Sequence, residues 1–93
     1  MDMRRLVGRN VRRVRQSKGL TQEQFADKSG FSQQYISGLE QGRRNPTVVT
    51  LYELARALGV SHVELILPDD GSYPTKGRVD AGVQLRKRTA RTD

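Results

Sequence analysis

The segment LTQEQFADKSGFSQQYISGLEQ, residues 20–41, decides the fold, because two helix starts follow one another within it. The first amide groups of a helix lack backbone partners, and a preceding Ser or Thr side chain can accept hydrogen bonds from them. At the first start, Thr21 is placed to cap and Gln24 to reach back as in a capping box. Leu20 and Phe25 flank this cap at the spacing of a hydrophobic staple.

The second start, at Ser32, repeats the cap and staple without the reciprocal Glu or Gln. We therefore predict helices over Thr21–Ser29 and Ser32–Gln41, separated only by Gly30 and Phe31. A helix-turn-helix needs a small residue where the helices cross, a turn residue that tolerates positive φ, and apolar residues that seat the second helix. Ala26 and Gly30 meet the first two requirements. The apolar residues are Phe25, Phe31, Ile36 and Leu39.

A further helical pattern precedes this pair. Val7, Val11 and Val14 recur at i, i+4 and i+7, which predicts a helix over Met3–Lys18 with an apolar stripe on one face. Gly19 is expected to end that helix in the left-handed conformation.

Two more helix starts follow. Asn45-Pro46-Thr47 predicts an entry turn in which Thr47 caps a helix that Gly59 closes, and Ser61 with Glu64 repeats the full capping box. The buried face of the helix after Thr47 consists of Leu51, Leu54, Ala55 and Leu58. The pattern predicts an all-α fold of five helices, forming one domain over residues 1–67.

Residues 68–93 differ in character. PDDGS at residues 68–72 is turn-forming, and the rest is sparse in apolar residues. We expect an irregular basic tail, with a short strand near Val83–Thr89 as the alternative. This tail could take part in dimerisation or bind another protein.

Composition narrows the classes of partner. Lys and Arg number 17 against 10 Asp and Glu, a formal net charge of +7, which favours a polyanionic partner. The sign alone does not separate nucleic acid from a membrane surface. The absence of cysteine excludes disulfides and thiolate metal sites. No apolar run resembles a signal peptide or reaches the roughly 18 residues of a membrane span, so we expect a soluble, cytoplasmic protein with no membrane partner.

The sequence offers little for catalysis. The sole histidine, His62, sits in the last predicted capping box without an identified partner, which is more often structural than catalytic. No glycine-rich phosphate loop or cluster of metal ligands occurs. We expect neither an enzyme nor a protein that needs a cofactor or a metal.

Three segments carry a family resemblance. LTQEQFA at 20–26, ISGLEQGRRNP at 36–46 and LGV at 58–60 resemble the XRE family, which includes the lambdoid phage repressors and Cro proteins. The resemblance covers roughly Leu6–Leu67 and implies a five-helix, lambda-repressor-like DNA-binding domain. Ser29 departs from the pattern, because the family usually has an apolar residue before the turn glycine, and this implies slightly looser packing there.

Helix geometry predicts which residues read bases. At 100° per residue, with Ile36 and Leu39 turned inward, the outward positions form one face, and Gln33 projects beyond the helix end as in a major-groove recognition helix. Glutamine pairs bidentately with adenine, so Gln33 and Gln34 are the leading candidates. Gly38 lies within this face, where its lack of a side chain either lets the helix enter the groove more deeply or has no function and is merely tolerated. The base-reading candidates are Gln33, Gln34, Ser37, Gly38 and Gln41.

Phosphate contacts are expected at helix starts and in the basic loop after the second helix. The resemblance implies that Gln22 clamps the sugar-phosphate backbone and that the loop lies against DNA. Tyr35 lies at the edge of the groove, where packing, a phosphate contact and a thymine-methyl contact all remain open. The phosphate-binding candidates are Gln22, Tyr35, Arg43, Arg44, Asn45 and Thr47. A general positive potential, without individual roles, is expected from Arg4, Arg5, Arg9, Arg12 and Arg13.

The resemblance also implies a structural salt bridge between Arg15 and Glu40 that holds the recognition helix. We therefore expect a transcriptional regulator that reads the major groove of double-stranded DNA with Ser32–Gln41. A single short helix reads few base pairs, so we expect a homodimer on two half-sites roughly 34 Å apart. The alternative is an antitoxin whose tail wraps a protein toxin, although the tail has few apolar anchors for such an interface.

Overall fold

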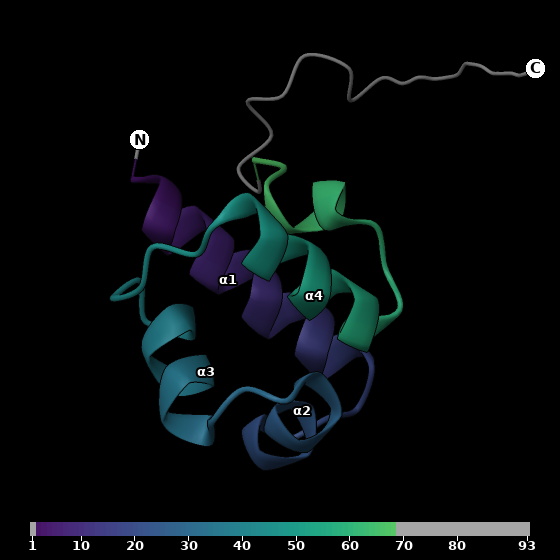
Figure 1. Ribbon diagram of the computed structural model, residues 1–93. Helices are drawn as coiled ribbons and strands as arrows, with labels where there is room; N and C mark the ends of the chain where they lie inside the picture. Colours follow the sequence, from purple (N-terminus) through teal and green to yellow (C-terminus); the bar gives the residue numbers. More distant parts are fainter. Residues whose placement is uncertain (1, 69–93) are drawn as a thin grey trace, which may run out of the picture.

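Four α-helices and one short 3-10 helix make up residues 2–68, the part of the chain that the computed structural model describes (Figure 1). Their bounds are α1 Met3–Ser17, α2 Gln22–Ser29, α3 Gln33–Glu40, α4 Val48–Leu58 and η1 His62–Leu65. This range contains no strand, which confirms the all-α prediction. None of its helices is both long and apolar enough to cross a bilayer.

The starts of α2, α3 and α4 form as the capping pattern predicts. Thr21 Oγ1 accepts from the Gln24 amide at 3.0 Å, and Gln24 Oε1 accepts from the Thr21 amide at 2.8 Å, which completes the capping box. The hydroxyls of Ser32 and Thr47 cap α3 and α4 in the same way. Gly30 takes a φ of +83° and turns the chain directly from α2 into α3.

The expectation of a fifth α-helix is wrong, because η1 is a 3-10 helix of four residues. Ser61 Oγ accepts from the Val63 amide at 3.2 Å, while the Glu64 amide donates to the Ser61 carbonyl at 3.0 Å, so the cap differs from the full capping box predicted for Ser61 and Glu64. Pro68 follows shortly afterwards, and a proline disfavours helical geometry in the residue before it. The segment therefore has room for one tight turn only. The predictions of an irregular basic tail, of a strand near Val83–Thr89 and of a role for residues 68–93 in dimerisation concern residues that lie, apart from Pro68, outside the described part.

The core lies between the helices and is apolar. Phe25, Ile36, Leu39 and Leu54 are fully buried within it, together with Val11 from α1. α3 packs against α1 and α2, while α4 packs against α2 and η1 (Figure 1). This arrangement buries one face of α3 and leaves the other open to solvent.

Two residues of α1 allow this packing. A Cβ added at Gly8 would lie 2.4 Å from the Leu39 carbonyl oxygen, so α1 and α3 cross in backbone contact that only glycine permits. Asn10 is fully buried, and its side-chain amide donates to the carbonyls of Leu65 and Leu67 at 3.1 and 2.8 Å. Gly8 therefore allows α3 to pack closely against α1, and Asn10 joins the end of η1 to α1.

Candidate nucleic-acid interface

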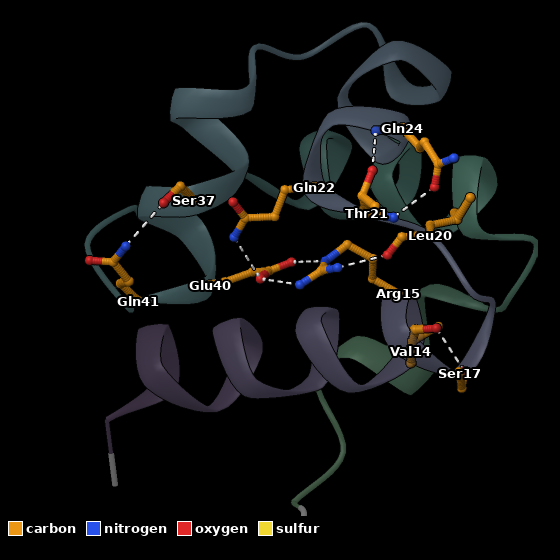
Figure 2. A network of polar contacts seen from close by, with 10 residues as sticks. All are labelled: Val14, Arg15, Ser17, Leu20, Thr21, Gln22, Gln24, Ser37, Glu40 and Gln41. Atoms are coloured by element: carbon orange, nitrogen blue, oxygen red, sulfur yellow. Dashed lines mark hydrogen bonds and ion pairs between the residues drawn. The ribbon is translucent and has the colours of Figure 1, made fainter.

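The exposed face of α3 and the loop after it enclose one surface hollow. It measures about 310 Å³. The lining residues are Gln34, Ser37, Gly38, Gln41, Arg43 and Arg44, all of which are among the sequence-predicted site residues. Gln41 Nε2 donates to Ser37 Oγ at 3.0 Å, which aligns these two side chains along the outer edge of α3 (Figure 2). Gln33 is also exposed, as the first residue of α3.

Tyr35 lies at the edge of this face and supports the loop. Its ring stacks on Phe31 with centroids 5.1 Å apart, and the Arg44 guanidinium lies 5.4 Å from the Tyr35 centroid. Burial raises the pKa of the Tyr35 hydroxyl above its ordinary value of 10.0, and the positive charge of Arg44 partly opposes this rise. Packing therefore explains Tyr35, and its contact holds Arg44 over the start of α3.

Glu40 anchors the far side of α3 to two other helices, as Figure 2 shows. Arg15 of α1 donates from Nε to Glu40 Oε2 at 2.6 Å and from Nη2 to Oε1 at 3.0 Å. Gln22 of α2 donates from Nε2 to Glu40 Oε1 at 3.1 Å. Arg15 also donates from Nη1 to the Leu20 carbonyl at 2.7 Å. The predicted pair of Arg15 and Glu40 is thus the centre of a network that links three helices.

The remaining phosphate candidates lie apart from the hollow. Thr47 Oγ1 accepts from the Thr50 amide at 3.0 Å, so this hydroxyl already serves the start of α4. Asn45 is exposed beside Pro46 and lines a smaller hollow with Met3 and Arg4 at the start of α1. The loop therefore presents Arg43 and Arg44 on the α3 side and Asn45 on the α1 side.

A comparison with protein-family models matches residues 11–65 to the helix-turn-helix model HTH_3. This match spans more than half of the chain, including α2, the turn at Gly30 and α3. The chain belongs to the helix-turn-helix family. The resemblance to XRE regulators, which rested on short segments, is thereby confirmed.

Relatives of this helix-turn-helix protein include an HTH-type transcriptional regulator of Sinorhizobium fredii, 71% identical over 70 residues that cover 75% of this chain and 91% of the relative. Among solved structures, a hypothetical transcription factor from Neisseria is 35% identical with a TM-score of 0.70, over 73% of this chain and 78% of that one. The controller protein C.Esp1396I, solved as a tetramer with its natural operator, is 35% identical with a TM-score of 0.65, over 70% of this chain and 86% of that one.

Sequence reasoning about this helix-turn-helix protein missed two contacts. Gln22 was predicted only as a phosphate clamp, yet its amide binds Glu40. Arg44 was predicted only as a phosphate ligand, yet it covers Tyr35. Gln22 and Glu40 are 18 positions apart and leave no periodic signal, because the two meet through helix packing and not through one helix face.

Proposed function

We propose that this chain is a sequence-specific transcriptional regulator that places α3 in the major groove of double-stranded DNA. The observation that carries this proposal is the hollow formed by Gln34, Ser37, Gly38 and Gln41 with the two arginines of the following loop. Amide and hydroxyl side chains suit base edges, and arginines at the rim suit phosphates. The names of the relatives described above support this proposal, since they are a transcriptional regulator, a transcription factor and a controller protein.

Within this proposal, Gln33 and Gln34 read adenines through bidentate hydrogen bonds, and Ser37 and Gln41 contact neighbouring base edges. Gly38 lets the helix approach closely. Arg43 and Arg44 bind phosphates of the DNA backbone, and in the free chain Arg44 lies over the Tyr35 ring.

The remaining phosphate candidates act at the margins. Asn45 and the amides at the Thr47 cap contact the backbone beside the loop, where the start of α4 favours an anion. Gln22 contacts a phosphate by turning part of its side-chain amide away from Glu40. The Tyr35 hydroxyl contacts the same sugar-phosphate backbone of the DNA. The chain performs this work in the cytoplasm, with no catalytic step.

We infer a homodimer from a second surface. Val48 and Val49, at the start of α4, are 78% and 69% exposed, and with Tyr52 and His62 they line an apolar hollow of about 300 Å³. Contiguous exposed apolar side chains of this kind mark an interaction site. A second copy of the chain is the occupant that we propose, because a two-fold interface pairs the same patch of both subunits and an apolar patch is complementary to itself. The tetramer of C.Esp1396I on its 35 base-pair operator is a related assembly.

A selection of binding sites from random duplex DNA, at stated salt, tests the function. We expect a recovered site with two-fold symmetry and half-sites about one helical turn apart. In an electrophoretic shift assay on that site, Gln33→Ala combined with Gln34→Ala should abolish specific binding. The control is Glu53→Ala with Arg56→Ala, which removes an exposed pair on α4 at unchanged net charge. Equal binding by both double variants would refute the base-reading roles, and recovery of no site would refute the function.

The antitoxin alternative gains nothing from these observations, because the relatives reported above carry regulator names and the tail it needs lies mostly outside the described residues. A toxin that co-purifies with the chain would restore it.

A further inference from the structure

The first turn of α1 lies directly against the end of the proposed recognition helix. Gly42, which follows α3, has a φ of +78°, and a Cβ added there would lie 2.8 Å from Arg5 Cγ and 3.2 Å from Arg5 Cα. Arg43 is the next residue along the chain. The backbone of α1 therefore approaches the turn as closely as glycine allows, and Arg5 starts within van der Waals distance of the loop that carries Arg43.

The side chain of Arg5 is available for a ligand. It is 72% exposed, and its Nε lies 3.5 Å from Asp2 Oδ2, a carboxylate that Arg4 shares at 4.0 Å. An exposed ion pair of this kind contributes little, about 0–1 kcal/mol. One carboxylate between two guanidinium groups also leaves the first turn with a net positive charge, so a phosphate can replace Asp2 as the partner of Arg5.

The arginines on α1 are not equivalent. At 100° per residue, Arg5 and Arg13 lie about 80° apart around α1. Arg13 Nη2 donates to Asn10 Oδ1 at 3.0 Å, and Asn10 in turn binds the end of η1. Arg13 thus joins the contacts between α1 and η1, whereas Arg5 lies against the loop after α3.

We propose that Arg5 is a phosphate ligand of the DNA complex, so that the first turn of α1 and the Arg43 loop grip the same stretch of backbone. This inference rests on the proposed function, and it gives an individual role to one member of a set for which sequence alone predicts only a general potential. Asp2 then acts as a weak competitor, because it occupies Arg5 in the free protein and must release it on binding.

The test measures the salt dependence of binding, which counts the phosphates that a protein neutralises. Wild type, Arg5→Gln and Arg56→Gln are titrated with a mixed-sequence duplex of roughly 30 base pairs, long enough for two half-sites, from low to moderate salt. Arg56 is a matched control, since its side chain is also 72% exposed and also pairs with a carboxylate three residues away, but on α4. Glutamine keeps most of the stem that lies beside Gly42, and thermal unfolding verifies that each variant folds.

We expect Arg5→Gln to reduce the slope of log K against log salt by about one per protomer, and so by about two for a dimer on this duplex, whereas Arg56→Gln leaves it unchanged. Between 50 and 200 mM salt, the wild-type dimer should then lose about tenfold more affinity than the Arg5→Gln dimer does. Asp2→Asn, which keeps a capping side chain at the start of α1, should tighten binding.

Equal slopes for wild type and Arg5→Gln, or equal losses for Arg5→Gln and Arg56→Gln, would overturn the inference while leaving the proposed function intact. Failure of the wild-type chain to bind the duplex at all would overturn both.

Discussion

Glu40 accepts hydrogen bonds from Arg15 of α1 and Gln22 of α2 while it belongs to α3. Its side chain is 3% exposed and that of Arg15 is 9% exposed, so neither charge has water as a substitute partner. A buried ion pair adds little net stability against an apolar pair, but the loss of one member leaves the other uncompensated. The network therefore matters mainly for where α3 sits.

We predict that Arg15→Met lowers the free energy of unfolding by about 3 kcal/mol, near the lower end for such pairs because Gln22 still binds Glu40. Arg15→Met combined with Glu40→Met should recover most of this loss. Urea denaturation of the single and double variants checks both values. A double variant as unstable as the single one would contradict the explanation.

Tyr35 gives a second prediction at this scale. Because burial raises the pKa of its hydroxyl in the folded state, the folded protein holds this proton more tightly than the unfolded chain does. The associated stability is fully present below about pH 10 and is lost as the pH rises through the folded pKa. Tyr35→Phe keeps the stack on Phe31 and should show a smaller fall in stability between about pH 9 and 11. Identical pH profiles for the two proteins would exclude this role.

At the scale of the element, α3 is held firmly by its neighbours, although its sequence includes a residue of low helix propensity. Gly8 and the Glu40 network hold its inner side, while Gly38 weakens its interior. An alanine Cβ at position 38 would lie 3.1 Å from Arg44 Nε, the mobile part of a long side chain that can shift. The glycine thus keeps the hollow open at the expense of helix stability.

We predict that Gly38→Ala raises the free energy of unfolding by up to about 1 kcal/mol, because alanine favours the helix. DNA affinity should fall at the same time, since the methyl group displaces Arg44 and fills part of the hollow. Chemical denaturation and an electrophoretic shift assay measure the two effects separately. A variant that is more stable and binds DNA as tightly as wild type would show that Gly38 has no function in the interface.

At the scale of the whole molecule, α4 has a buried apolar part and an exposed apolar part. Leu54, Ala55 and Leu58 are buried in the core, whereas Val48 and Val49 remain exposed at the other end of the same helix. Water contact by these valines is unfavourable, and the second copy of the chain in the proposed homodimer would relieve it.

We predict that Val48→Glu combined with Val49→Glu gives a folded monomer, because the exposed sites tolerate charge but a two-fold interface brings like charges together. Sedimentation equilibrium measures the mass, with Lys18→Glu, an exposed position at the end of α1 that changes the net charge by the same amount, as the control. Affinity for a two-fold DNA site should fall sharply in the valine variant. A wild-type monomer, or a variant that still dimerises, would remove this surface from the assembly.

The sequence by itself determined the local features of the fold. The caps at Thr21, Ser32 and Thr47 and the left-handed Gly30 follow from hydrogen bonds and backbone sterics within a few residues. The outward face of α3 also followed, since the 3.6-residue period fixes which side chains oppose Ile36 and Leu39.

Only the tertiary structure decided the rest. The contact of Gly8 with the α3 carbonyls, the bonds from Asn10 to η1 and the bond from Gln22 to Glu40 join residues far apart in the chain. Such contacts depend on how helices pack in three dimensions, and packing leaves no periodic trace in one sequence. For the same reason, the place of Arg5 beside Gly42 became visible only once α1 lay across the end of α3.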